Sequence, residues 1–126
     1  MAPTRPTSSD LESVDLVLRL LEFLAKSRDQ RGVTEVARAL DISKPRAHRH
    51  LRALVHRGYA RQDTRTEGYE IGIKLLALGE SVRDRFDVAG GIRPVMEPLR
   101  EATGLAVTAS ALIDGAVTVV EMLHGR

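Results

Sequence analysis

The 126-residue sequence contains no cysteine and no tryptophan, and its only aromatic residues are Phe23, Tyr59, Tyr69 and Phe86. The absence of cysteine excludes disulfides, thiolate zinc sites and cysteine nucleophiles, and it is typical of a reducing compartment. So few aromatic rings favour an aliphatic core and leave few platforms on which single-stranded bases could stack. No apolar run approaches about 18 residues, so no segment is expected to span a membrane. We therefore expect a soluble intracellular protein.

A basic segment lies between Lys44 and Arg65, where seven Lys or Arg residues stand against a single acid, Asp63. The rest of the sequence carries twelve basic and sixteen acidic residues, so the net charge of +2 combines a segment of +6 with a background of −4. Three of the four histidines also fall in this segment. Such a local excess indicates a surface that meets a polyanion. The alternative is a solvated basic helix face.

Two apolar stripes run along the first predicted helix, which extends from about Leu11 to Ser27 after a cap at Ser8, Ser9 or Asp10. The first stripe has helical spacing and comprises Leu11, Val14, Leu18, Leu21 and Ala25, widened by Val17 and Leu24. The second stripe, on the opposite side, comprises Leu16, Leu20 and Phe23. Because one small core uses a single stripe of roughly 100°, we expect the second stripe to be buried against a second subunit.

A helix-turn-helix is predicted next. Thr34 is the expected N-cap of a short helix over residues 35–40, and Ser43 is the expected N-cap of a helix that ends before Gly58. Pro45 is tolerated in the first turn of the second helix. The buried side of that helix comprises Ala47, Leu51, Leu54 and Val55. A turn this short between two helices with matching apolar faces is typical of the helix-turn-helix.

Two short strands, residues 59–62 and 69–72, flank a polar loop and predict a β-hairpin with a partly basic tip. Together with the preceding helices, this hairpin predicts a winged helix-turn-helix over residues 10–72, after a disordered tail over residues 1–9. The next stretch, residues 73–88, has helical spacing and is expected to be a linker helix. Its apolar face comprises Leu75, Leu78, Val82 and Phe86, of which we expect the first three to take part in dimerisation.

The C-terminal residues, 89–126, predict the beginning of an α/β domain. Gly90-Gly91 is expected to break the helical pattern before a helix over residues 92–103, which Pro98 should kink or cause to start later. Strands are predicted over residues 105–113 and 116–123, joined by the turn Asp114-Gly115. Because a helix and one hairpin bury too little surface to stand alone, we expect this domain to be truncated. The predicted fold class is mainly α with small β.

Catalytic, cofactor and metal sites are not indicated. The glycines build no phosphate loop, and no nucleophile, base and orienting group can be assembled from the sequence. His48 and His50 suggest a metal pair, but residues two apart on a helix point about 200° from each other and cannot chelate one ion. We therefore expect a non-enzyme that uses no cofactor and no metal.

The helix that starts at Ser43 is the candidate for reading double-stranded DNA. Residues near its N-terminus would reach base edges in the major groove, with Arg46 as the first candidate for a bidentate contact with guanine, and later residues would reach phosphates. Arg49 suits either role, and Arg52 suits a phosphate. Thr34 offers a hydroxyl at a helix N-terminus or serves only as a cap, and Arg65 contacts DNA from the wing or is merely solvated. The predicted DNA-contacting residues are Thr34, Ser43, Lys44, Pro45, Arg46, His48, Arg49, His50, Arg52 and Arg65.

These residues resemble the N-terminal part of the IclR family of bacterial transcriptional regulators. The resemblance rests on the segments 13–21, 33–44, 48–54, 58–59 and 69–79. It implies a winged-helix DNA-binding domain, a linker helix and a C-terminal α/β domain that binds a small-molecule effector. It also implies a cytoplasmic, nucleoid-associated protein that forms dimers, often paired into tetramers, and represses or activates neighbouring operons. Arg49 matches the family's arginine in the recognition helix.

Two departures from the family pattern affect these expectations. Pro45-Arg46 replaces the small hydroxyl pair that usually follows Lys44, so the operator sequence of relatives cannot be transferred. The effector domain stops at Arg126, so we expect no complete pocket and no tight binding of a small molecule. The sequence thus favours a dimeric, sequence-specific DNA-binding regulator. The alternative is a truncated dimerisation module that modulates full-length regulators without binding DNA itself.

Overall fold

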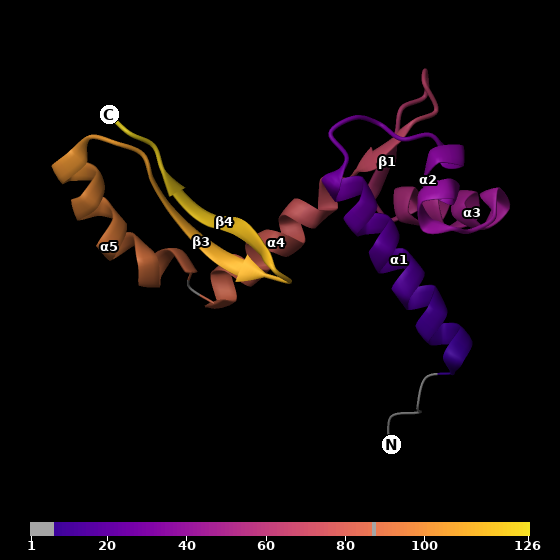
Figure 1. Cartoon of the computed structure of the whole chain (residues 1–126), viewed down its shortest axis with the longest axis horizontal. Helices are drawn as coiled ribbons and strands as arrows, with labels where there is room; N and C mark the ends of the chain where they lie inside the picture. The colour runs from indigo at the N-terminus through magenta and orange to yellow at the C-terminus, as the bar shows by residue number, and fades with distance from the viewer. Residues whose placement is uncertain (1–6, 87) are drawn as a thin grey trace. The chain divides into compact units, whose positions relative to one another are not determined.

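The computed structural model describes residues 7–86 and 88–126. They belong to two compact units, one ending at Ala77 and the other beginning at Leu78. The elements follow in the order α1 (Ser8–Lys26), α2 (Val33–Leu40), α3 (Lys44–His56), β1 (Ala60–Gln62), β2 (Tyr69–Ile71), α4 (Lys74–Phe86), α5 (Val88–Thr103), β3 (Val107–Ile113) and β4 (Ala116–Leu123) (Figure 1). Five helices and two small antiparallel sheets in the described part confirm the predicted fold class.

The first helix begins earlier than predicted, because Thr7 and not a later residue is its N-cap. The Thr7 hydroxyl accepts a hydrogen bond from the Asp10 backbone N–H, and the Asp10 carboxylate accepts one from the Thr7 backbone N–H. This reciprocal capping box satisfies two donors of the first turn. Ser8 and Ser9 are therefore helical, which corrects the tail predicted over residues 1–9. The first six residues of that tail lie outside the described residues.

The face of α1 that packs into the core is the one that the sequence analysis assigned to a second subunit. Leu16, Leu20 and Leu24 are buried, with Leu20 completely inaccessible. Leu11, Val14 and Leu18 are instead 56%, 58% and 53% exposed. The predicted dimerisation role of Leu16 and Leu20 is therefore wrong, and Phe23 is half-buried against the same core. Periodicity finds both apolar faces of a helix but does not say which one meets the rest of the chain.

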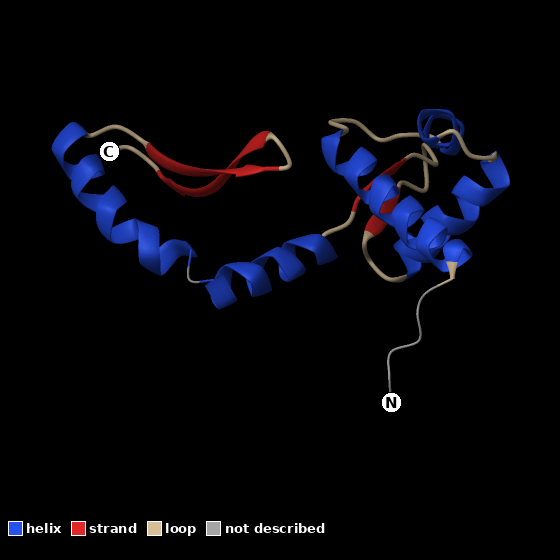
Figure 2. Cartoon of the chain, turned by 60° about the horizontal axis from the view of Figure 1, so that its bottom comes forward, coloured by secondary structure: helices blue, strands red, loops and turns tan. Residues whose placement is uncertain are grey.

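The core of the N-terminal unit is aliphatic, as the composition predicted. Leu16, Leu20 and Leu24 of α1 pack with residues of α2, α3 and the first two strands, namely Val36, Ala37, Leu40, Ala47, Leu51, Leu54, Ala60 and Tyr69. Tyr69 is the one fully buried aromatic side chain in the described part, and burial raises the pKa of its hydroxyl. Figure 2 shows the helices of this unit gathered around the short red strands.

The helix-turn-helix forms at the predicted place, with one correction. The N-cap of α2 is Gly32, so Thr34 lies inside the first turn and does not cap it. The turn after α2 uses Asp41 in the left-handed region, with φ 54° and ψ 51°, a conformation that Asp tolerates better than most residues. Ser43 caps α3 as predicted, because its hydroxyl accepts a hydrogen bond from the Arg46 backbone N–H at 3.3 Å.

The wing is a hairpin of β1 and β2, in which Ala60 pairs with Ile71 and Gln62 with Tyr69. Arg31, in the connection between α1 and α2, pairs with the outer side of β2 through two backbone hydrogen bonds of 2.8 Å to Tyr69. Beyond β2, Gly72 lies so close to the preceding turn that a Cβ atom would come within 2.2 Å of the Gly58 carbonyl oxygen. Only glycine therefore lets the chain leave the wing and enter α4 along this path.

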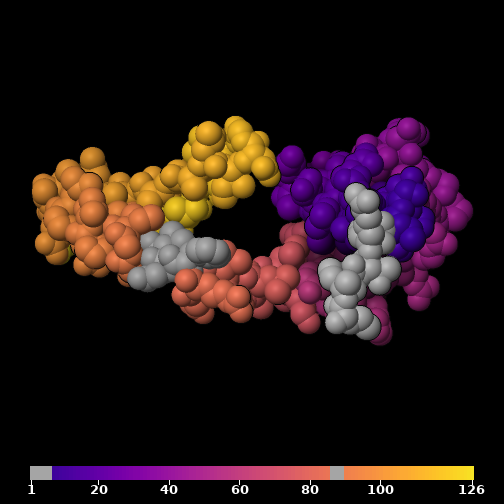
Figure 3. All heavy atoms as spheres, turned by 90° about the horizontal axis from the view of Figure 1, so that it is seen from below, coloured from indigo at the N-terminus to yellow at the C-terminus, as the bar shows by residue number. Residues whose placement is uncertain are grey.

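The C-terminal unit contains the end of α4, α5 and the β3–β4 hairpin. Asp114 and Gly115 both have positive φ, as the predicted two-residue turn requires. Helix α5 differs from the prediction, because it begins at Val88 and runs through Gly90-Gly91, Pro94 and Pro98. It lies against the hairpin (Figures 2 and 3), and Met96, Leu123 and Glu121 are buried between them. Glu121, only 6% exposed, forms ion pairs with Arg83 and Arg93 at 3.3 and 3.7 Å.

Two alanine substitutions on α1 test which face is internal. Leu20→Ala should lower the free energy of unfolding by about 2–5 kcal/mol, because it leaves a cavity in a packed core. Leu18→Ala should change it by no more than about 0.5 kcal/mol at protein concentrations where the chain is monomeric. Urea denaturation followed by circular dichroism measures both. Equal losses for the two variants would contradict the assignment of faces.

Candidate nucleic-acid interface

Helix α3 turns its apolar residues inward and its cations outward. Ala47, Leu51 and Leu54 are buried. The exposed side chains are Lys44, His48, Arg49, Arg52, His56 and Arg57. None of these six takes part in an ion pair with another described residue. The exposed face of α3, with Arg57 at its C-cap, thus carries a row of cations, Lys44, Arg49, Arg52 and Arg57, that have no internal partner among the described residues, and His48 and His56 lie beside them.

The N-terminal turn of α3 carries positive charge where most helices prefer negative charge. Lys44 and Arg46 lie in this turn and no acid does. Cations at a helix N-terminus oppose the macrodipole at a cost of about 0.3–1 kcal/mol each. The Arg46 N–H of this turn is bonded to the Ser43 hydroxyl at 3.3 Å and the Ala47 N–H to the Ser43 carbonyl oxygen at 3.0 Å, so an anion such as a phosphate would meet chiefly the Lys44 and Arg46 side chains. Pro45 has no N–H and is exposed, so it offers only an apolar contact.

Arg46 lies at the edge of the exposed face of α3. It is half-buried and borders a hollow of about 300 Å³ together with Glu12, Asp15 and Arg19 of α1 and Asp41 of the turn. No carboxylate oxygen of these acids lies within 4.0 Å of its guanidinium group. The acids therefore surround Arg46 without pairing to it, and they lower the local positive potential relative to the rest of α3.

The two histidines that were predicted to contact DNA, His48 and His50, differ in their surroundings. His50 is half-buried, and its Nδ1 donates a hydrogen bond to the Arg46 carbonyl oxygen at 2.8 Å, so only Nε2 remains for another partner. His48 is exposed and borders a second hollow, of about 410 Å³, between α3 and β1. Its other lining residues are Arg52, Val55, His56 and Gln62. This hollow places two histidines and an arginine next to the wing.

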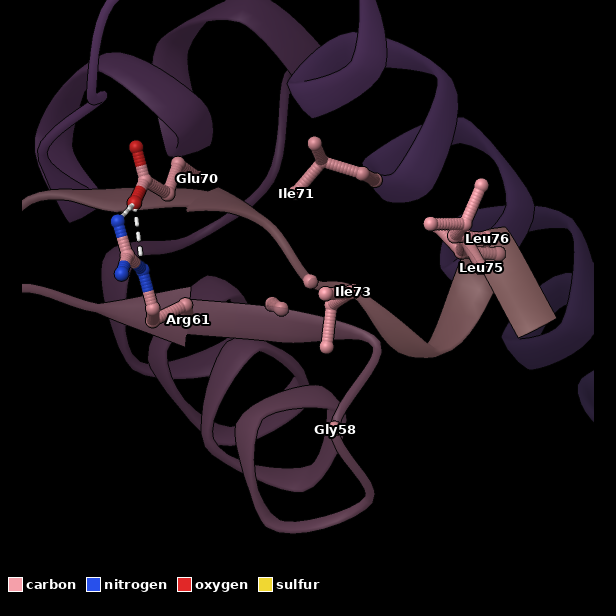
Figure 4. A pocket seen from close by; sticks show the side chains of 9 residues that line it. Gly58, Arg61, Glu70, Ile71, Ile73, Leu75 and Leu76 are labelled. Atoms are coloured by element: carbon pink, nitrogen blue, oxygen red, sulfur yellow. Dashed lines mark hydrogen bonds and ion pairs between the residues drawn. The ribbon is translucent and has the colours of Figure 1, made fainter.

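The loop of the wing is ordered by Asp63, which accepts hydrogen bonds through both carboxylate oxygens. Oδ1 accepts from the backbone N–H groups of Arg65 and Thr66 at 2.8 and 3.0 Å, and Oδ2 accepts from Gln30 Nε2 at 3.2 Å. Arg65 is exposed and forms no ion pair in the described part. Arg61, at the base of the wing, is paired with Glu70 across the two strands (Figure 4). Arg65 is therefore the available cation of the wing.

Thr34 is exposed in the first turn of α2 and has no hydrogen-bond partner for its side chain among the described residues. Because it does not serve as the cap, its hydroxyl is available to a ligand. Sequence reasoning did not identify three features of this surface: the acids around Arg46, the Gln62 edge of the hollow and the contact from Gln30. These features depend on packing between segments far apart in the chain, and no local motif signals them.

The remaining apolar residues predicted for dimerisation lie on α4. Leu78 and Val82 are exposed and Leu75 is half-buried, and the side chain of Phe86 lies outside the described residues. Leu75 and Leu76 border an apolar groove of about 790 Å³ with Ile71 and Ile73 at the end of the wing (Figure 4). In the described part of the chain, no group of His, Asp and Glu side chains is arranged to hold a metal ion, and no helix is long and apolar enough to cross a membrane.

An exposed row of cations on the second helix of a helix-turn-helix, next to a two-stranded wing, defines a winged-helix protein of the DNA-binding class. Residues 13–64 match the family model of the IclR helix-turn-helix domain. The chain is an IclR-type protein. The IclR-type relatives are transcriptional regulators and not enzymes.

Three comparisons show the extent of this likeness. The HTH-type transcriptional regulator BhcR of Paracoccus denitrificans is 30% identical over 97 residues, which cover 77% of this chain and 34% of that protein. The glycerol operon regulatory protein of Streptomyces griseus is 27% identical over 111 residues, which cover 88% and 44%. The structure of an IclR family regulator from Brucella abortus shares the fold with a TM-score of 0.80 at 22% identity, over 99% of this chain and 48% of that one. The chain thus spans less than half of the length of each of these relatives.

Asp63 gives the wing loop a predictable pH dependence. The backbone N–H of Thr66, the Gln30 amide and the backbone N–H of Arg65 hold the pKa of this carboxyl group below its usual value. These bonds favour the charged form in the folded state, so their contribution is complete above the ordinary pKa of about 3.9 and is lost as the pH falls through the lowered value. The amide signals of Arg65 and Thr66 should therefore titrate below pH 3.9 or so in NMR spectra. Asp63→Asn should abolish this titration, and a midpoint above the ordinary value would contradict the assignment.

Proposed function

We propose that this chain is a sequence-specific DNA-binding transcriptional regulator that inserts α3 into the major groove of an operator. The observation that carries the proposal is the row of exposed cations on α3, which have no acidic partner among the described residues. If these cations formed only a solvated basic face, they could lie on any exposed helix. Here the row lies on the second helix of a helix-turn-helix, and this is the element that enters the groove in proteins of this class.

The exposed residues divide between base and phosphate contacts according to their position along α3. Arg46 and Arg49 lie nearest the N-terminal end and are our candidates for base edges, where a bidentate guanidinium contact with guanine is the most specific option. Arg52, one turn further on, faces the hollow beside β1 and suits a phosphate. Thr34, Ser43 and Lys44 supply hydroxyl and ammonium groups for the backbone of the same duplex. Arg65 contacts the adjoining groove or phosphate from the wing.

The regulator acts as a homodimer through the exposed face of α1. Leu11, Val14, Leu18, Leu21 and Ala25 follow one another at spacings of three and four residues, the pattern of a two-helix seam. Three of them are more than half exposed, although they are large and apolar. A twofold dimer formed across this stripe would place two copies of α3 on successive half-sites, so we expect an operator with approximate twofold symmetry.

Several wider roles follow as proposals from the relatives. The relative from Streptomyces griseus is named as the regulator of an operon, which supports an operator close to the operon that this protein controls. We propose that residues 78–126 belong to a domain that binds a small-molecule effector, and that complete regulators pair into tetramers. The site of action would be the cytoplasm, where the operator lies.

A dimerisation module without DNA binding is the second candidate. Of the residues predicted for dimerisation, Leu16 and Leu20 belong to the core, Phe23 and Leu75 are half-buried, and Leu78 and Val82 are exposed. The stripe from Leu11 to Ala25 would have to supply the α1 part of the dimer contact in place of Leu16 and Leu20. The exposed α3 cations would have no role in such a module, so the observations favour the DNA-binding regulator. A gel shift with the DNA beside the protein's own gene separates the two.

Two arginines on α3 should differ in their effect on DNA binding. Arg46→Ala should weaken operator binding by about 1–3 kcal/mol and relax the preference at one base pair, because a bidentate base contact is lost. Arg52→Ala should weaken operator and scrambled duplexes alike and reduce the slope of log K against log salt by about one. Titrations of both duplexes at several salt concentrations measure these effects. Equal losses on both duplexes for Arg46→Ala would remove it from base recognition.

A single charge on the α1 stripe should dissociate the dimer. Leu18→Glu places a carboxylate in the proposed seam and should shift the sedimentation coefficient to that of a monomer. Ser13→Glu is the matched control, because Ser13 is an exposed α1 residue outside the stripe and receives the same charge. The control should sediment as the unsubstituted chain does. If Leu18→Glu remains dimeric, the seam lies elsewhere.

A further inference from the structure

The wing is fastened to the connection between α1 and α2 by one side chain, Gln30. Its Nε2 donates a hydrogen bond to Asp63 Oδ2 at 3.2 Å, and its Oε1 accepts one from the Thr66 hydroxyl at 2.6 Å. Gln30 thus uses its donor and its acceptor at once, on two residues that are 33 and 36 positions away in the sequence. A surface glutamine with no structural role would rarely satisfy both groups on one distant loop.

The two loop residues bound by Gln30 are also those that fix the backbone around Arg65. Asp63 Oδ1 accepts the N–H of Arg65 at 2.8 Å and the N–H of Thr66 at 3.0 Å. The Thr66 hydroxyl accepts the N–H of Gly68 at 3.2 Å. The backbone of Arg65 is therefore one hydrogen bond away from a carboxylate that Gln30 holds from the other side.

The close approach of Gly68 shows that Gln30 fits the loop closely. A Cβ atom at position 68 would lie 2.8 Å from the Cβ of Gln30 and 3.0 Å from its Oε1. Gly68 is buried and Gln30 is half-buried. The neighbouring Arg31–Tyr69 backbone pair, at 2.8 Å in both directions, keeps the two segments in register. The connection and the wing loop are thus joined by backbone and side-chain contacts over consecutive residues.

Arg65 itself is exposed and without an ion pair in the part of the chain that the structure describes, so its guanidinium group is available. If the loop that carries it were free, ordering that loop on binding would oppose association. A loop that is already fixed avoids this cost. The position of Arg65 in the free protein therefore depends on contacts that Arg65 does not make itself.

We infer that Gln30 is a positioning residue for DNA binding, which holds the wing loop so that Arg65 meets the DNA backbone in a fixed place. This inference rests on the proposed function as a DNA-binding regulator. Gln30 touches no DNA in this arrangement and acts through Asp63 and Thr66. Its contribution should therefore exist only while Arg65 is present.

A double-substitution cycle tests this dependence. The full chain and its Gln30→Ala, Arg65→Ala and Gln30→Ala/Arg65→Ala variants are titrated, at several salt concentrations, against a labelled duplex from the region beside its own gene. Arg65→Ala should weaken binding and reduce the salt slope by about one. Gln30→Ala should weaken binding roughly threefold to tenfold, the range expected when one side chain must be ordered on association. The double variant should bind as Arg65→Ala does.

A matched pair at Thr66 repeats the test without altering Gln30. Thr66→Ser keeps the hydroxyl and should bind DNA as the unsubstituted chain does. Thr66→Val keeps the shape but loses the hydrogen bonds of the hydroxyl to Gln30 and from the Gly68 N–H, and it should weaken binding only while Arg65 is present. Thermal denaturation of each variant identifies any loss of fold, and the Thr66 pair keeps the test valid if Gln30→Ala does not fold.

The outcomes separate the inference from the function on which it rests. If the unsubstituted chain binds DNA and Gln30→Ala binds with the same affinity and salt slope, the positioning role is wrong and the proposed function stands. Losses that simply add in the double variant would also overturn the positioning role, because Gln30 would then act independently of Arg65. If the unsubstituted chain binds no duplex at any salt concentration, the proposed function fails, and the role of Gln30 fails with it.

Discussion

The burial of one face of α1 is the constraint on which the N-terminal unit depends. Leu16, Leu20 and Leu24 supply the α1 side of a core that is aliphatic apart from Tyr69. Aliphatic side chains must then interdigitate closely to reach the density of a protein interior. Because Leu51 and Leu54 of α3 pack against the same cluster, the orientation of α3 about its own axis is set by this contact. The outward direction of its cations is therefore a consequence of how the core is filled.

The same packing leaves a second apolar face of α1 uncovered. A helix with apolar residues on two sides cannot bury both against one small core, and Leu11, Val14 and Leu18 are left exposed while Leu21 is partly covered by the core. In the proposed dimer, one face of α1 stabilises the chain and the other face joins two chains. The distance between two copies of α3 would then be fixed by α1, and half-site spacing on DNA would follow from helix packing.

Electrostatics and geometry are combined differently in α3 and in the wing. In α3, unpaired cations occupy the first turn, where the helix dipole disfavours them, and acids of α1 together with Asp41 border the same hollow as Arg46. In the wing, Arg61 is neutralised by Glu70 while Arg65 is unpaired on a loop fixed by Asp63. In each element one arginine lies near acidic side chains, paired in the wing and unpaired in α3, and another arginine forms no ion pair in the described part. Such a pattern limits non-specific attraction while keeping a few directed contacts.

The sequence by itself determined the identity and order of the elements of the winged helix-turn-helix, because caps, turn residues and periodicity act locally. The Ser43 cap, the end of α3 before Gly58, the Asp114-Gly115 turn and the inward side of α3 were all predictable in this way. Only the tertiary structure decided which stripe of α1 is internal, since both have helical spacing and the choice depends on the facing helices. The tertiary structure also decided that Gln30 reaches the wing and that acids surround Arg46. The Gln30 contacts, and the approach of the α1 acids to Arg46, join residues more than twenty positions apart, and no local pattern encodes such a distance.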